Sequence, residues 1–308
     1  MRRFPSSPPS GFALIAVLWM LILISALAVG AATTSQTETR LAANVLAVAQ
    51  ARHLAEGGIL VAVKQLIESD ARAQRCLDGR VFSSMTLDQS EVDISVRDEA
   101  GKIDLNEAAQ PLLRGLFSAA GKDPQEADAL ADAVLDWRDG DHERSPNGAE
   151  DSDYRLSKLG HGAKDARFES IYELLSVKGI TRELFDRIRD DITVHSRVPT
   201  IDPKSATALA LAAVPGYQNQ VAREYVALRG SIANCADVPP PPLLPSAALY
   251  LGPSPGLSFT ISAAATIDGA HFTRQAIVGL TFRRDEPFQI LGWGVRARSP
   301  NVSTNESP

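Results

Sequence analysis

The most distinctive chemistry in the sequence lies in an acidic segment spanning residues 136–154. Counted from its Asp139, carboxylates fall at the first, third, fifth and twelfth positions, which are Asp139, Asp141, Glu143 and Glu150. Interspersed Gly, Pro, Asn and Ser residues favour a loop, and calcium takes about six to eight oxygen ligands from such loops. The order is close to that of an EF-hand, but Arg144 stands where that motif needs glycine. The segment therefore indicates either a cation-binding loop of another kind or a solvated acidic loop.

Other side chains that could support chemistry are scattered along the chain. The five histidines form no His-x-x-x-His pair and accompany no nucleophile elbow or phosphate-binding loop. His142 and His161 lie near the acidic segment, where they could join a transition-metal site or simply be exposed. Ser145 and Ser152 have no partner pattern for nucleophilic catalysis. We therefore expect that the protein is not an enzyme.

The N-terminal region predicts a membrane-spanning helix. No Asp, Glu, Lys or Arg occurs from Phe12 to Thr37, and an apolar helix of about 20 residues crosses the hydrocarbon layer of a bilayer. Arg2 and Arg3 precede this run, so the short basic end should stay in the cytoplasm. The rest of the chain should then face outward, across the membrane.

Three interpretations of this segment differ in how it is processed. A cleavable secretory signal would use Ala26-Leu27-Ala28 as its cleavage site, and an uncleaved signal anchor would stay intact. The third is a type IV prepilin-like leader, which the short basic peptide ending in Gly11, followed by Phe12 and a long apolar helix, resembles. That resemblance implies cleavage after Gly11 by a prepilin peptidase and methylation of Phe12.

The residue five places into such a mature chain refines the resemblance. Most pilin-like subunits carry Glu there, but this chain has Ala16. An unpaired carboxylate in hydrocarbon is costly, so a subunit with no neighbour to pair with gains by losing it. The chain thus resembles the protein K family, the minor pseudopilins of type II secretion systems. The resemblance implies a place at the tip of the pseudopilus.

The patterning beyond the membrane segment predicts an α+β fold. The helix should continue as an amphipathic one to about residues 69–75, bending at Gly57-Gly58. Alternating apolar residues predict strands at 81–82 and 91–98, with Val92, Ile94 and Val96 inward, and at 257–267, 271–283 and 288–296. More than a hundred mainly helical residues separate the two sets, with helices predicted at 125–136, 167–175, 182–189 and 203–213. We expect a pilin-like long N-terminal helix packed on an antiparallel sheet, with a large all-α domain inserted between strands.

The predicted domain boundaries follow from these patterns. They are a leader peptide at 1–11, a transmembrane helix at 12–32, the pseudopilin helix and first strands at 33–100, the inserted domain at 101–235, a Pro-rich connector and last strands at 236–298, and a disordered tail at 299–308. Cys76, at the foot of the long helix, and Cys235, where the insert rejoins the pseudopilin head, would lie at comparable borders of the head and face an oxidising compartment. We expect a disulfide between them, the alternative being two buried thiols.

Two helix-turn-helix repeats within the insert raise a different function. Residues 174–188 and 209–228 both resemble helix-hairpin-helix units, some of which bind nucleic-acid phosphates through backbone N–H groups. However, residues 101–230 contain 22 acidic against 17 basic residues, whereas phosphate binding requires a basic surface. We therefore expect packing units and no nucleic-acid partner.

The resemblance to the protein K family carries further expectations. The D-W-x-D-x-D segment beginning at Asp136, followed by G-A-E-D-x-x-Y, is similar to a stretch in which this family binds calcium. It implies the ligands Asp139, Asp141, Glu150 and Asp153, with Asp136, Glu143 and Asp151 as further candidates. It also implies assembly with the minor pseudopilins I and J to initiate or cap the filament. The alternatives are a signal-peptide-processed periplasmic binding protein and a membrane-anchored DNA-binding protein.

Overall fold

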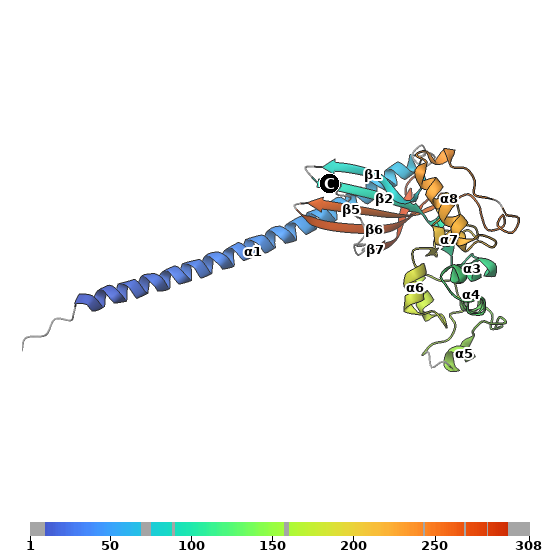
Figure 1. Ribbon diagram of the computed structural model, residues 1–308, viewed down its shortest axis with the longest axis horizontal. Helices are drawn as coiled ribbons and strands as arrows, with labels where there is room; N and C mark the ends of the chain where they lie inside the picture. Colours follow the sequence, from blue (N-terminus) through green and yellow to red (C-terminus); the bar gives the residue numbers. More distant parts are fainter. Residues whose placement is uncertain are drawn as a thin grey trace, which may run out of the picture.

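The structure, a computed structural model, describes residues 10–68, 75–87, 90–156, 160–242, 244–267, 269–281 and 283–294. The described chain forms a long N-terminal helix, a sheet and a mostly helical insert, and the insert lies far from the helix N-terminus (Figure 1). The predicted α+β fold class is therefore confirmed. Most of the predicted leader and the predicted tail at 299–308 lie outside the described residues, as do the side chains of Gly11 and Phe12.

Helix α1, Ser10–Ile67, is continuous over 58 residues and has two different surroundings. Its Ala13–Gly30 segment has a mean hydropathy of 2.7 and is fully exposed, so it is long and apolar enough to cross a membrane. The second half presents a stripe of buried side chains that packs on the sheet: Ala51, Ala55, Ile59, Ala62 and Leu66. The alanines in this stripe let the helix axis approach the strands closely.

Helix α1 is continuous through Gly57 and Gly58, so the predicted weakening or bending at these residues does not interrupt it. Gly58 instead lies against the sheet, where a Cβ atom would come within 3.0 Å of Val92 Cγ1 and 3.2 Å of Ala263 Cβ. Gly57 faces open space, with no atom within 4 Å of such a Cβ. Gly58 therefore allows close helix packing where a side chain would separate α1 from the strands.

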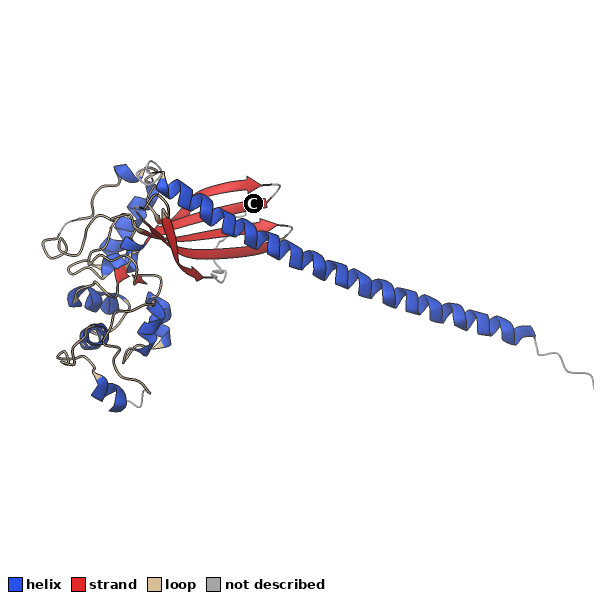
Figure 2. Ribbon diagram, turned by 180° about the vertical axis from the view of Figure 1, so that it is seen from behind, coloured by secondary structure: helices blue, strands red, loops and turns tan. Residues whose placement is uncertain are grey.

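The sheet contains β1 (Asp78–Leu87), β2 (Ser90–Asp98), β5 (Ser258–Ile267), β6 (Ala270–Leu280) and β7 (Phe288–Gly294). All neighbours in the order β1-β2-β5-β6-β7 pair antiparallel. Helix α1 crosses one face of this sheet (Figure 2). Val92, Ile94 and Val96 are buried there, as their alternation predicts. At the β5–β6 turn, Gly269 has a φ of +79°, which glycine adopts without strain.

The insert leaves and rejoins the sheet at one place, since Asp98 at the end of β2 lies opposite Phe259 at the start of β5. Its helices pack around their own apolar core. They are η1 (Glu99–Gly101), α3 (Gln110–Ala119), α4 (Pro124–Arg138), α5 (Asp151–Leu156), η2 (Ile171–Ser176), α6 (Arg182–Ile188), α7 (Ala208–Ala212), α8 (Asn219–Ser231) and η3 (Cys235–Asp237). The expectation of an all-α insert misses one feature, a short parallel pairing of β3 (Ile103–Asp104) with β4 (Ile192–Thr193).

Two predicted helices are shorter than their apolar patterns suggest. Of the predicted 203–213 helix only Ala208–Ala212 forms, because Asp202 accepts hydrogen bonds from the Lys204 N–H and the Ser205 hydroxyl and holds a turn instead. The predicted 167–175 helix is the 3₁₀ helix η2, which starts at a capping box made by Ser170 and Glu173. Short polar side chains that bond to nearby backbone groups favour such turns and caps over helix interiors.

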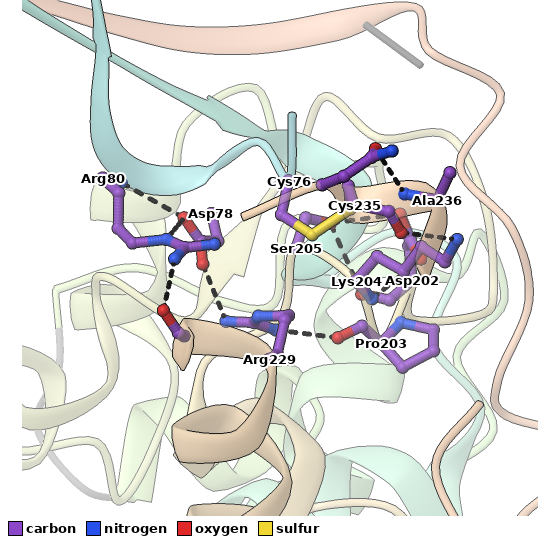
Figure 3. Close-up of a disulfide and its surroundings, with 12 residues drawn as sticks. Cys76, Asp78, Arg80, Asp202, Pro203, Lys204, Ser205, Arg229, Cys235 and Ala236 are labelled. Atoms are coloured by element: carbon purple, nitrogen blue, oxygen red, sulfur yellow. Dashed lines mark hydrogen bonds and ion pairs between the residues drawn. A yellow bond between two sulfur atoms is a disulfide. The ribbon is translucent and has the colours of Figure 1, made fainter. Parts of the chain in front are cut away.

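A seam of polar and covalent links fastens the insert to the sheet (Figure 3). Cys76 and Cys235 are joined by a disulfide with a Cα–Cα distance of 4.9 Å. Beside it, buried Arg229 of α8 pairs with Asp78 of β1, with 3.3 Å between Nη2 and Oδ2, and donates to the carbonyl oxygens of Pro203 and Ala206. The covalent link and the buried ion pair together fix the orientation of the insert on the sheet.

Candidate metal centre

The acidic loop is anchored by an aromatic cluster at the end of α4. The ring of Trp137 lies 5.7 Å from that of Tyr154 and 6.3 Å from that of Phe168, measured between centroids. Both Trp137 and Tyr154 are buried, and the Tyr154 hydroxyl accepts a hydrogen bond from the Lys178 N–H. These contacts draw the start of the loop at Asp139, the helix α5 and the segment around residue 165 to one point.

Several carboxylate oxygens at this point are buried without a partner among the described residues. Glu150 is 6% exposed, and both its Oε1 and its Oε2 lack a hydrogen bond. The same holds for Oδ1 of Asp139 and Oδ1 of Asp165. One donor atom each from His142, Glu150 and Asp165 lie within 4.8 Å of one another. A buried carboxylate without a hydrogen bond is costly, and a cation bound among these oxygens would offset that cost.

The pKa values of two carboxyl groups at the site, Glu150 and Asp139, are raised. Burial raises the pKa of Glu150, and the charges of Asp136 and Asp165 add to the effect. Burial likewise raises the pKa of Asp139, helped by Asp141 and Asp136. Carboxylates held this close resist simultaneous ionisation unless a positive charge is bound between them.

The structure places the other predicted ligands at the edge of this cluster, with partners of their own. Asp153 is paired with Arg144 and Lys178, at 3.4 Å each. Its pKa is lowered: burial opposes ionisation, but the Glu150 N–H and the two cations outweigh it. Asp153 therefore already has its charge neutralised by protein groups.

The remaining predicted ligands either accept hydrogen bonds from backbone N–H groups or are exposed to solvent. Asp136 is fully buried and accepts from the Ser145 N–H, and Asp151 accepts from the Ala163 N–H. Asp141 accepts from the backbone N–H of Glu143, whose own side chain is exposed. These bonds shape the loop, and Asp141 also adds negative charge beside Asp139.

Sequence reasoning missed Asp165 as a member of the cluster. It lies beyond the acidic segment, on the stretch that returns past α5, and has a φ of +53°. An isolated Asp in a Gly-rich segment resembles any turn residue. Its role depends on the aromatic packing that returns this stretch to Asp139.

A divalent cation fits the residues present. Ligands of one ion with bonds of about 2.0–2.6 Å lie at most about 5 Å apart, and the donor atoms of His142, Glu150 and Asp165 meet that limit. Asp139 supplies a further unpartnered oxygen next to them. The site would hold such an ion chiefly through Asp139, Glu150 and Asp165.

The two helix-hairpin-helix units form, but their turns are engaged within the protein. Gly179 and Gly216 occupy the turns with φ values of +87° and +92°. The Lys178 ammonium next to the first turn pairs with Asp153. At the second turn, the Ser246 hydroxyl donates to the Pro215 carbonyl oxygen. These contacts are those of packing units.

Comparison with known proteins links this architecture to one family. Residues 91–197, from β2 to just beyond β4, match the family described as type II secretion system protein K. Among curated relatives, protein K of Pseudomonas aeruginosa is 26% identical over 190 residues, covering 55% of this chain and 57% of that protein. Protein K of Klebsiella pneumoniae is 27% identical over 43% of each. The resemblance to the protein K family is confirmed.

The matched part is limited in length, since the chain spans about half of each of these protein K relatives. A solved structure described as the GspK-GspI-GspJ complex from enterotoxigenic Escherichia coli shares the fold. Its TM-score is 0.52 at 14% identity, covering 86% of this chain and 99% of the other. The likeness of fold to a chain of that complex thus extends over most of this chain.

Proposed function

We propose that this protein is a minor pseudopilin of a type II secretion system that acts at the tip of the pseudopilus. The observation that carries the proposal is the placement of the insert, which lies at the end of the molecule opposite the membrane segment of α1 (Figure 1). A filament that grows by packing such helices side by side would expose this end. The bulk of the insert would then hinder the addition of another subunit above it.

The N-terminal segment supports a role as a membrane-anchored assembly subunit. Ala13–Gly30 would be the single span in the inner membrane, with the sheet and insert in the periplasm. The disulfide between Cys76 and Cys235 is compatible with that oxidising compartment. Ala16 removes the carboxylate that a neighbouring subunit would otherwise have to neutralise. The role is one of assembly for protein export across the outer membrane, and no catalytic step is part of it.

The partners in this proposal are the minor pseudopilins I and J. The support is the shared fold with a chain from a complex that contains GspI and GspJ. To test it, the full chain is expressed with its I and J counterparts, extracted in detergent and passed over a sizing column. We expect a stable complex of the three proteins. If the chain elutes alone while I and J associate with each other, the tip assignment is wrong.

Calcium is the ion that we propose for the acidic loop, with Asp139, Glu150 and Asp165 as the principal ligands. It would supply the positive charge that the unpartnered oxygens need and would hold the loop against α4. Calorimetry of the full chain with calcium chloride should give a binding heat that Glu150→Ala removes. The matched control Glu143→Ala, in an exposed side chain of the same loop, should retain it. Absence of heat from the unmodified protein would end the proposal.

A further inference from the structure

His142 is the member of the acidic site that a calcium function does not need. Its Nδ1 atom lies 3.4 Å from Oδ2 of Asp165, and one of its ring nitrogens belongs to the donor group with Glu150 and Asp165. The side chain is 78% exposed, so burial does not force the ring into this position. The loop itself brings a nitrogen donor to a carboxylate site.

A nitrogen donor changes which ions a site prefers. Calcium takes oxygen ligands almost exclusively, whereas imidazole suits zinc and its neighbours in the first transition row. A set of carboxylates with one imidazole can therefore bind calcium through its oxygens alone, or a zinc-class ion through its oxygens and the ring nitrogen.

An ion pair between His142 and Asp165 does not account for the whole site. The pair leaves both Glu150 oxygens and Oδ1 of Asp139 buried and unpartnered among the described residues. Glu150 is more than nine-tenths buried, so solvent does not compensate it. An ion shared by the ring and the carboxylates would satisfy all of these groups.

We propose that the acidic loop also binds a divalent transition metal of the zinc class, with His142 as nitrogen ligand beside Glu150, Asp165 and Asp139. The inference rests on the cation site of the proposed function. It adds that the ring is used for zinc and not for calcium. His142 thereby determines the relative affinity of the site for the two ions.

The test compares zinc and calcium binding in matched variants of the full chain in detergent. Zinc chloride is titrated in competition with a chromophoric chelator, and calcium chloride is titrated by calorimetry. We expect His142→Ala to weaken zinc binding by at least about 10- to 100-fold, since removal of even an outer partner of a metal ligand costs that much, while calcium affinity stays the same. The control His161→Ala removes a nearby ring outside the donor group, which packs edge-on to Trp137 and tilted against Tyr154; it should leave zinc affinity unchanged.

Cobalt provides an independent readout of nitrogen ligation. Cobalt(II) loaded in place of zinc should give a visible absorption spectrum that changes on His142→Ala and not on His161→Ala. Glu150→Gln, close in shape to the native side chain, should weaken zinc and calcium together, with circular dichroism checking the fold. That result would support one shared site.

The outcomes separate the inference from the proposed function. Equal zinc affinity in His142→Ala and the unmodified protein, with calcium binding intact, overturns the role of His142 and leaves the calcium site standing. Loss of zinc binding in His161→Ala alone places zinc elsewhere and also overturns the inference. If neither ion binds the unmodified chain, both proposals fail.

Discussion

Glu150 and Asp98 are both buried carboxylates, but only Asp98 has hydrogen-bond partners for its side chain among the described residues. Glu150 lies in the acidic loop with both oxygens unpartnered, whereas Asp98, at the end of β2, accepts hydrogen bonds from the Ala100 N–H and the Ser254 hydroxyl. Burial nevertheless raises the pKa of Asp98 to about 6, against the effect of those hydrogen bonds, and Asp202 adds to the rise. Asp98 thus has protein partners for its carboxylate, whereas the Glu150 oxygens have none among the described residues.

The raised pKa of Asp98 predicts a pH dependence of stability. A carboxyl whose pKa is higher in the folded than in the unfolded chain binds more protons when folded, so its contribution to stability falls as pH rises from 3.8 to about 6. Asp98→Asn removes this titration. From pH 7 to pH 5 the unmodified protein should therefore gain roughly 1 kcal/mol relative to the variant.

The measurement is urea unfolding of both proteins at the two pH values, followed by circular dichroism in one detergent. Titration of the distant acidic loop is common to both proteins and cancels in the comparison, whereas the part of the Asp202 titration that depends on Asp98 belongs to the measured difference. Identical changes in the two would show that Asp98 titrates at its ordinary pKa.

At the scale of elements, the buried Arg229–Asp78 pair between α8 and β1 should contribute more to stability than the more exposed Arg80–Asp78 pair beside it. Arg229 and Arg80 both pair with Asp78, but their side chains are 3% and 45% exposed. Breaking a buried pair costs about 3–5 kcal/mol, and Arg229→Ala should fall in this range because it also leaves the Pro203 and Ala206 carbonyl oxygens without their donor, although Arg80 still contacts Asp78. Arg80→Ala should cost less than about 1 kcal/mol. Denaturant unfolding of the two variants would test this, and equal losses would contradict it.

A second prediction at this scale concerns the contact between α1 and the sheet, and it compares substitutions at the adjacent residues Gly58 and Gly57. Gly58→Leu must push α1 away from Val92 and Ala263, and overpacking of this kind costs about 1–3 kcal/mol. Gly57→Ala adds a methyl group in open space and should stabilise the helix by about 0.5–1 kcal/mol. Thermal unfolding should show a lower melting temperature for Gly58→Leu and a higher one for Gly57→Ala. A stabilised Gly58→Leu variant would mean that the helix can shift at no cost.

For the whole molecule, the N-terminal segment decides whether the chain is an assembly subunit or a released periplasmic protein. The prepilin-like interpretation predicts a mature chain that begins at Phe12 and carries an N-methyl group. Gly11→Leu should block this cleavage, whereas Ala28→Leu, at the rival signal-peptide site, should not. Intact mass spectrometry of the protein from membranes distinguishes the two. A mature chain beginning at Val29 would favour the periplasmic binding protein.

Local patterns in the sequence were enough to predict the long helix, the antiparallel strands and their inward residues, and the place of the insert. Helix and strand periodicity are local properties, and the stripe from Ala51 to Leu66 and the alternation of Val92, Ile94 and Val96 repeat over many residues. The pairing of Cys76 with Cys235 was expected from compartment and position, and the structure contains it.

Only the tertiary structure decided which residues of the acidic segment come together. Asp165 joins Asp139 and Glu150 because Trp137 packs between Tyr154 and Phe168 and draws the returning chain to the loop. Asp153, which has the right chemistry and spacing, is instead neutralised by Lys178 and Arg144. A sequence gives the donor types, but their partners depend on contacts between distant residues. The sequence therefore predicted an acidic cation loop, and packing decided which of its carboxylates lie together.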